Sequence, residues 1–124
     1  MGLLDGLMGN ASEADAVEVN AELVSILADN EQVQHAYKMV RDLHVFTNKR
    51  LINIDKQGMT GKKIDYLSIP YKSITQFMVE TGGHFDTDCE LKIWISGQAE
   101  PIEIELKSAL AADVQKTLAN MLFL

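Results

Sequence analysis

Apolar residues near the start of the chain recur three or four positions apart. They are Val19, Leu23, Ile26 and Leu27. This spacing is typical of one buried face of an α-helix. Acidic residues crowd the first turns of the same stretch, where the positive end of a helix dipole favours negative charge. We therefore predict a helix from Ser12 to about Asn30, with Ser12 as its capping residue.

After residue 31 the apolar period changes to two, which is typical of β-strands with one buried face. Seven such segments follow, at 33–39, 43–47, 52–54, 64–69, 74–81, 91–96 and 102–107. The last segment has the most regular alternation, because charged residues separate Ile102, Ile104 and Leu106. We therefore predict that these three side chains point into the core, under the C-terminal helix.

The period changes again after residue 107. A single helical stripe then contains Leu110, Val114, Leu118, Met121 and Leu122. Ser108 is the predicted N-cap of this helix. The order of a helix, seven short strands and a helix predicts a mainly β domain, an antiparallel sandwich or barrel. We expect one domain, with a helical segment at 1–30, a β-barrel at 31–107 and a capping helix at 108–124.

Composition narrows the function. The 124 residues carry a formal net charge of −7 and include one cysteine. Such an acidic chain should repel nucleic acid and anionic lipid unless a local basic patch prevails. A single cysteine allows no internal disulfide, which favours a reducing, cytoplasmic location. The stretch MGLLDGLMGNASEAD has no basic residue, unlike a secretory signal, and no apolar run is long enough for a membrane span. We expect a soluble protein.

Three stretches of the sequence resemble a known family: RDLHVFTNKRLINIDKQGMTGKK, SIPYKSI and FMVETGGHFDTDCELKIWISG. They are similar to the bacterial pleckstrin-homology domain family, formerly a domain of unknown function, and TNKRLI and IPYKSI are the most specific blocks. The resemblance implies a pleckstrin-homology-like barrel of about seven antiparallel strands with a C-terminal capping helix, here with an extra N-terminal helix. It also implies self-association into ring-like oligomers. It implies neither an enzymatic activity nor an established ligand.

The basic stretch TNKR, Thr47 to Arg50, interrupts the alternation. Lys and Arg beside turn amides can hold a phosphate, and eukaryotic pleckstrin-homology domains bind phosphoinositide head groups through basic residues near their first hairpin. In this sequence the first turn, 41–42, has no basic run. We therefore interpret TNKR as a hairpin corner in which Asn48 tolerates turn dihedrals, the threonine hydrogen-bonds across the corner and the two cations are solvated.

Charge is distributed unevenly along the chain. The first thirty-seven residues contain seven acids and no base, whereas the segment Lys38–Lys63 has seven bases and two acids. Its bases are Lys38, Arg41, Lys49, Arg50, Lys56, Lys62 and Lys63. This segment could bind an anionic ligand or lipid head group, or it could face the acidic helix of another copy. In a third interpretation the two charged regions are solvated and do not interact.

Trp94 is the chain's single tryptophan. The alternation places it on the polar face of its strand, with Lys92 and Ser96, rather than with the flanking isoleucines. A tryptophan on a polar face is typical of an interface. The alternative is that Trp94 lies under the N-terminal helix of its own chain.

Other residue patterns point to no chemistry. His35, His44 and His84 lack the spacing of a metal site. The acidic stretch 86–90 lacks the EF-hand pattern and fits a solvated loop. Apart from the presence of both residue types, nothing in the sequence supports a catalytic dyad of Cys89 with a distant histidine. We predict no catalytic residue, no metal and no cofactor.

These observations predict a non-enzymatic interaction or scaffold module that forms homo-oligomers. Its candidate contact residues are Lys49, Arg50, Lys56, Lys62, Lys63 and Trp94. We expect a further protein partner of unknown identity, no binding to nucleic acid and at most weak binding to membranes. One alternative is a binder of an anionic ligand or lipid head group through Lys38–Lys63. A second alternative is an enzyme of unknown type.

Overall fold

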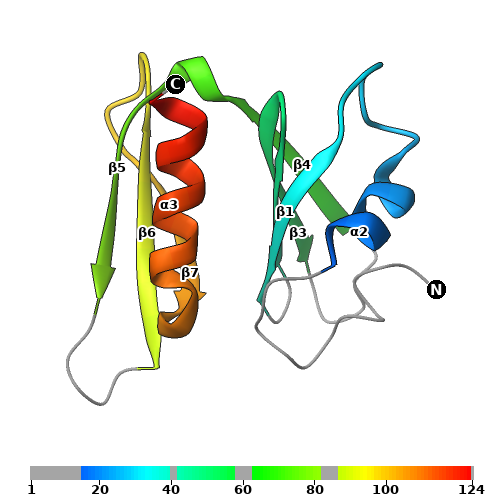
Figure 1. The fold of residues 1–124 in the computed structure, drawn as a ribbon. Helices are drawn as coiled ribbons and strands as arrows, with labels where there is room; N and C mark the ends of the chain where they lie inside the picture. Colours follow the sequence, from blue (N-terminus) through cyan, green and yellow to red (C-terminus); the bar gives the residue numbers. More distant parts are fainter. Residues whose placement is uncertain (1–14, 40–41, 58–62, 82–86, 124) are drawn as a thin grey trace. The chain divides into compact units, whose positions relative to one another are not determined.

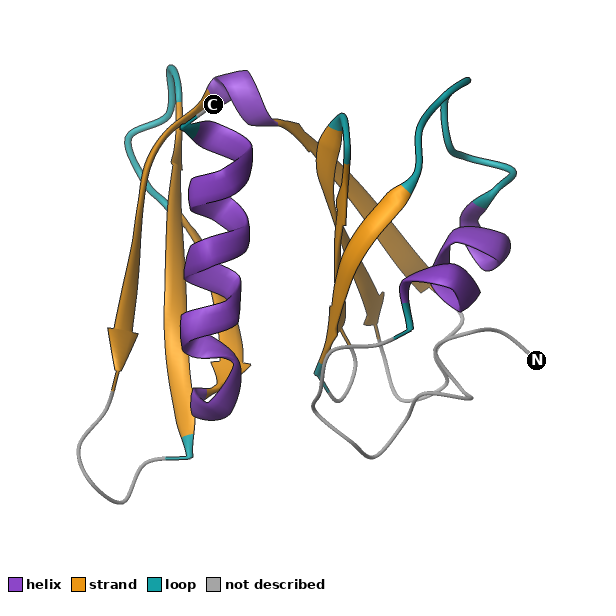
Figure 2. Cartoon of the chain, in the orientation of Figure 1, coloured by secondary structure: helices purple, strands orange, loops and turns teal. Residues whose placement is uncertain are grey.

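The computed structural model describes residues 15–39, 42–57, 63–81 and 87–123. Seven antiparallel strands form two sheets, with a helix before the first strand and another after the last (Figures 1 and 2). The predicted mainly β fold class is therefore confirmed. The chain divides into two compact units, Met1–Ile69 and Pro70–Leu124. The expectation of a single domain stays a prediction.

The first unit contains a helix packed on a four-stranded sheet. Its elements are α2 (Ala16–Leu23), β1 (Val33–Lys38), β2 (Asp42–Thr47), β3 (Arg50–Gln57) and β4 (Lys63–Pro70), and the strands pair in chain order. Val19 and Leu23 of α2 pack against apolar side chains of the first three strands: Val33, Ala36, Leu43, Val45, Ile52 and Ile54. The predicted helix face is confirmed for Val19 and Leu23. It is wrong for Ile26, which is 42% exposed.

Helix α2 begins later than the sequence predicts. Its N-cap is Asp15, whose side chain accepts a 2.9 Å hydrogen bond from the Val17 amide. This contact satisfies one of the amides that the first turn of a helix leaves without a partner. Ser12, the predicted cap, lies outside the described residues.

Helix α2 also ends earlier than predicted, at Leu23 rather than near Asn30. The Ile26 amide donates to the Leu23 carbonyl at 2.9 Å, a tightened spacing that is common at helix ends. The Glu31 side chain then accepts a hydrogen bond from the Ala28 amide at 2.8 Å, and Asn30 has a positive φ of 63°. The helix stops because this side chain and the left-handed asparagine turn the chain back toward β1.

The second unit contains a three-stranded sheet and the C-terminal helix. Its elements are η1 (Tyr71–Ser73), β5 (Ile74–Thr81), β6 (Asp88–Ile95), β7 (Ile102–Lys107), η2 (Ser108–Leu110) and α3 (Ala111–Leu122). The strands pair antiparallel in the order β5-β6-β7. The α3 residues that face inward include Val114 and Leu118, which confirms this part of the predicted stripe.

Strand β7 has the predicted alternation. Ile104 and Leu106 are buried, whereas Glu103 and Glu105 between and beside them are exposed. Ile102, at the start of the strand, is half-buried. The assignment of the apolar residues to the inward face is therefore confirmed, with the deepest burial at the centre and end of the strand.

Helix α3 covers one face of this sheet (Figure 1). Phe123, just beyond the helix, stacks on Phe77 of β5 with ring centroids 6.2 Å apart. Phe77 is in register with Ile93, which is in register with Ile102. Residues directly opposite each other in antiparallel strands share a face. The apolar face of β5-β6-β7 is thus the face that α3 covers.

Two sequence predictions in this unit are wrong. The acidic stretch 86–90, predicted to be a loop, is partly a strand, because β6 begins at Asp88. The Lys107 ammonium of β7 donates to Oδ1 of Asp88 at 2.9 Å. Ser108 is not the N-cap of α3, because it opens the short turn η2. The N-cap position belongs to Leu110, which makes no side-chain capping bond.

Candidate functional site

The TNKR corner joins β2 to β3, and Thr47 holds it. The Thr47 hydroxyl accepts hydrogen bonds from the amides of Lys49 and Arg50 at 3.0 and 2.9 Å. It donates to Oε2 of Glu31 at 2.6 Å. The predicted hydrogen bond of Thr47 across the corner is confirmed, and it extends to a glutamate that sequence analysis did not single out.

Arg50 is not the solvated cation that the sequence suggested. Its Nε lies 2.9 Å from Oε2 of Glu31, and its Nη2 donates to Oε1 of the same carboxylate at 3.1 Å. The remaining guanidinium contacts, both 2.8 Å, are to the Ile26 carbonyl and the Ser68 hydroxyl. Most of the five N–H donors of the guanidinium are therefore occupied within the chain. A phosphate at Arg50 would have to displace Glu31.

Asn48 connects the same corner to the segment before β1. Its side-chain Nδ2 donates to the Asn30 carbonyl at 3.0 Å, and its Oδ1 accepts from the Gln32 amide at 2.7 Å. The Asn48 amide also donates to the Gln32 carbonyl at 3.1 Å. These bonds hold the segment just after α2 against the corner between β2 and β3. We call the cluster of Glu31, Thr47, Asn48 and Arg50 the corner clamp.

Glu31 is the charged centre of the corner clamp. Its side chain is 1% exposed. Burial by itself would raise the pKa of this carboxyl, but hydrogen bonds from Arg50, Thr47 and the Ala28 amide, with the charge of Arg50, outweigh it and lower the pKa to about 2. The carboxylate is therefore ionised and paired at any physiological pH, and the clamp works as a structural ion pair.

The other described bases of the basic segment differ in their exposure to solvent. Lys38 is buried, and its Nζ donates to the Met39 carbonyl at 2.7 Å. Lys56 is half-buried, whereas Lys49 and Lys63 are exposed. Arg41 and Lys62 lie outside the described residues. A contact of the exposed lysines with an anion or with another subunit stays a prediction.

We expect weak binding to liposomes that contain anionic lipid at physiological salt. Arg50 is neutralised by Glu31, and the chain as a whole carries a net charge of −7. Attraction to the few exposed lysines should weaken further as salt rises, because surface charges are screened. Liposome co-sedimentation across a salt series, with neutral liposomes as the control, measures this. Tight, salt-resistant binding to one phosphoinositide would contradict the prediction.

Trp94 lies on the outward face of β6. It is half-buried and stands opposite Gln76 of β5, while Lys92 on the same face lies 3.9 Å from Glu80 and 3.7 Å from Glu90. The predicted placement of Trp94 with Lys92 on a polar face is confirmed. Its role in an interface stays a prediction.

His44 and Cys89 are two further buried titratable groups outside the corner clamp. Nδ1 of His44 lies 2.9 Å from Oδ1 of Asn53, and Nε2 has no hydrogen-bond partner within the described residues. Burial lowers the pKa of His44 and favours the neutral ring. Burial also raises the pKa of Cys89, helped by the charge of Asp88, so the thiol is held protonated. This is the opposite of the activation that a nucleophilic cysteine needs.

Neither a metal cluster nor a membrane helix is found in the described part of the chain. The His, Cys, Asp and Glu side chains described there form no group of three or more that could hold a metal ion. None of the helices described is both long enough and apolar enough to cross a bilayer.

Comparison with known proteins identifies the family. The family model described as "Bacterial PH domain" matches residues 2–122. The chain belongs to the bacterial pleckstrin-homology domain family. The similarity suspected from the TNKRLI and IPYKSI blocks is thereby confirmed. Pleckstrin-homology domains are generally non-enzymatic.

Relatives of this bacterial pleckstrin-homology protein cover nearly its whole length. The Bacillus subtilis (strain 168) protein YjqA, described as uncharacterized, is 55% identical over 96% of this chain and 97% of its own. A DUF1696 family protein with a pleckstrin-homology domain from Shewanella loihica PV-4 has a TM-score of 0.82 at 56% identity, covering 92% and 98% of the two chains. A pleckstrin-homology domain from Shewanella amazonensis SB2B has a TM-score of 0.81 at 62% identity, covering 98% of each chain.

Proposed function

We propose that this bacterial pleckstrin-homology protein is a non-enzymatic interaction module that acts as a homo-oligomer. The observation that carries the proposal is the exposure of apolar side chains along β4, which is an edge strand of its sheet. Ile64, Tyr66 and Leu67 are 37%, 53% and 48% exposed. A second copy that covers this strand would remove these side chains from water.

Strand β4 differs from the strands inside the same sheet. In β2, every residue from Leu43 to Thr47 is buried, whereas every residue of β4 from Lys63 to Ser68 is exposed. Edge strands with exposed apolar side chains also present unpaired backbone groups, which makes them ready sites for pairing with another chain. Pairing of β4 with the next copy would provide the contact for the ring-like assembly that the family resemblance implies.

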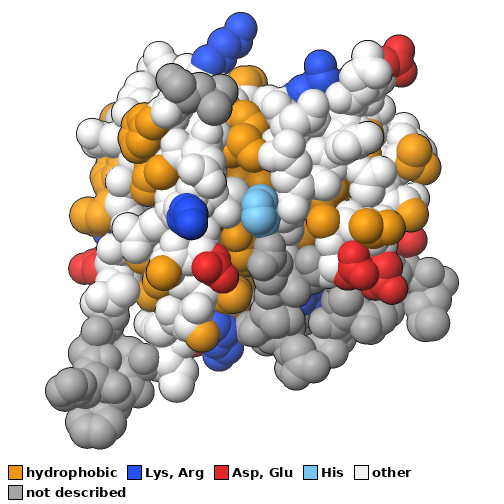
Figure 3. Space-filling view, viewed as in Figure 1, with side chains coloured by type: hydrophobic (Ala, Val, Ile, Leu, Met, Phe, Trp, Pro, Cys, Tyr) orange, Lys and Arg blue, Asp and Glu red, His pale blue; other side chains and the backbone are white. Residues whose placement is uncertain are grey.

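Charge provides a second, weaker contribution. Figure 3 shows acidic side chains beside hydrophobic ones over α2, and Asp15, Glu18 and Glu22 there are exposed. Lys49 and Lys63 are the exposed bases of the described part of the basic segment. A head-to-tail contact between the acidic helix of one copy and these lysines of the next can close into a ring when its rotation allows.

We expect an oligomer at micromolar concentration and a clear loss of assembly in Leu67→Lys. A buried lysine at a former apolar contact should weaken association roughly tenfold or more. Sedimentation velocity and light scattering after size exclusion measure this. Met78→Lys is the matched control, because Met78 is an exposed apolar residue, 43% exposed, on edge strand β5 of the other sheet.

The outcomes separate the parts of the proposal. A monomeric wild type would contradict homo-oligomerisation, and equal effects of Leu67→Lys and Met78→Lys would exclude β4 as the contact. A salt series on Lys49→Glu tests the charge contribution. Lys49 suits this test because it is exposed, whereas a change at Arg50 would also break the corner clamp. Assembly that is indifferent to salt and to Lys49→Glu would leave apolar burial and strand pairing as the cause.

A further inference from the structure

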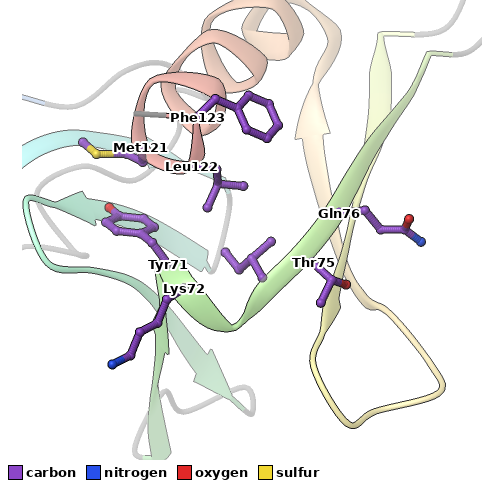
Figure 4. A pocket seen from close by; sticks show the side chains of 8 residues that line it. Tyr71, Lys72, Thr75, Gln76, Met121, Leu122 and Phe123 are labelled. Carbon is purple, nitrogen blue, oxygen red and sulfur yellow. The ribbon is translucent and has the colours of Figure 1, made fainter.

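The second unit holds a pocket between η1, the start of β5 and the last turn of α3 (Figure 4). Its volume of about 410 Å³ falls in the range of small-molecule sites, roughly 300–1,000 Å³. Apolar side chains from two elements line it: Ile74, Met121, Leu122 and Phe123. Sites of this size with an apolar lining and a few polar groups are those that bind small ligands.

The apolar lining is only partly used by the protein itself. Ile74 is 8% exposed, but Phe123 remains 73% exposed although its ring stacks on Phe77. Figure 4 shows Leu122 and Phe123 projecting from the end of α3, with Tyr71 lying on the η1 side of the pocket. A bound hydrocarbon chain would cover the free aromatic surface and gain the usual free energy of apolar burial.

The polar groups at the rim oppose each other in charge. Lys72 is exposed and makes no ion pair within the described residues. Met121 and Leu122 of the last turn of α3 line the pocket, and the end of this helix carries the negative end of the helix dipole. An anion drawn to the lysine is repelled by this negative end, and a cation drawn to the negative end is repelled by the lysine. A hydroxyl or amide accepts from one and donates to the other.

We propose that this pocket binds a small uncharged amphiphile: an apolar chain with one hydroxyl or amide group. The apolar chain lies on Leu122 and Phe123, and the polar group lies at the rim. In Figure 4 the Lys72 side chain extends away from Leu122, and its flexible stem allows the ammonium to turn toward a bound hydroxyl. Thr75 and Gln76 project from β5 away from α3 at the other edge. This site is independent of β4 and of homo-oligomerisation.

The test compares three probes with the same chain: 1-octanol, octanoate and octylammonium. Amide resonances of the full-length protein are followed by NMR during each titration. We expect octanol to shift the amides of Ile74, Leu122 and Phe123 and to bind roughly two- to fivefold more tightly than either ion, the size expected for opposing exposed charges. Octanoate as the tightest ligand, or no shift at these amides with any probe, would overturn the proposal.

Substitutions at Lys72 test the balance of charges. In Lys72→Gln the negative end of α3 is left unopposed, so octylammonium should bind more tightly than in the wild type. Lys116→Gln, which removes an exposed lysine from the middle of α3, is the matched control and should change nothing. Leu122→Asn should weaken all three probes together. If Lys72→Gln left the relative affinities for the three probes unchanged, the proposal would be contradicted. Amide shifts that depend on protein concentration instead of on octanol would also contradict it, because a second copy would then occupy the pocket.

Discussion

Arg50→Ala should destabilise the fold by roughly 3–5 kcal/mol, as expected when one partner of a buried ion pair is removed. The Glu31 carboxylate has a side chain that is 1% exposed, and without Arg50 it would remain buried with no opposing charge. Thr47 and the Ala28 amide would still donate to it, but they carry no charge. Urea unfolding followed by circular dichroism measures the loss.

Two variants make this result specific. Lys49→Ala is the matched control, because Lys49 lies beside Arg50 in the same corner but is exposed, and it should change stability by no more than about 0.5 kcal/mol. The double variant Glu31→Leu, Arg50→Leu should lose less stability than the sum of the losses in the two single variants. The reason is that it removes the buried charge together with its partner. Additive losses would show that the pair is not coupled.

The pH dependence of wild-type stability is a second test of the ion pair between Glu31 and Arg50. Glu31 has a pKa of about 2 in the fold and an ordinary value of 4.5. Because the folded pKa is the lower one, the pair contributes fully above pH 4.5 and loses its contribution as pH falls toward 2, a change of roughly 3 kcal/mol. His44, with a folded pKa below 6.5, adds a loss that begins as pH falls below 6.5. Arg50→Ala should flatten the part of the profile below pH 4.5.

Ile104→Ala should cost roughly 2–5 kcal/mol, the usual range for truncating a buried isoleucine. Ile104 is 5% exposed and stands in register with Leu91, which is 2% exposed, on the face that α3 covers. Glu105→Ala, at the next position on the opposite face, is the matched control and should change stability by a few tenths of a kcal/mol. Denaturant unfolding of both variants measures the difference. Similar losses at the two positions would contradict the assigned strand faces.

Strand β7 could be predicted from the sequence because it has a local signature of burial. In β7 the alternation of Ile104 and Leu106 with glutamates records which face meets water, and the structure repeats it residue by residue. Strand β5 was predicted with its observed bounds, Ile74–Thr81. The family resemblance also came from local stretches: TNKRLI lies at the corner between β2 and β3, and IPYKSI spans the end of β4, η1 and the start of β5.

The ends of elements were less predictable, because they depend on contacts from elsewhere in the chain. Helix α2 stops at Leu23 although helical spacing continues to Leu27. The side chain that accepts the Ala28 amide belongs to Glu31, which is held in turn by Thr47 and Arg50. A periodic pattern reports only the local balance of apolar and polar positions. It therefore contains no sign that a side chain from outside the helix bonds the Ala28 amide.

The sequence by itself determined the class of fold, the two faces of β7 and the acidic and basic halves of the first unit. Only the tertiary structure decided what the charges do. It pairs Arg50 with Glu31, nineteen positions away, and leaves Lys49 exposed one position before it. It also leaves the apolar residues of β4 exposed while it buries those of β2. The reason is physical: residue type and spacing set which side chains can be buried, but a charge is neutralised and an apolar side chain is covered only by groups that folding brings to it.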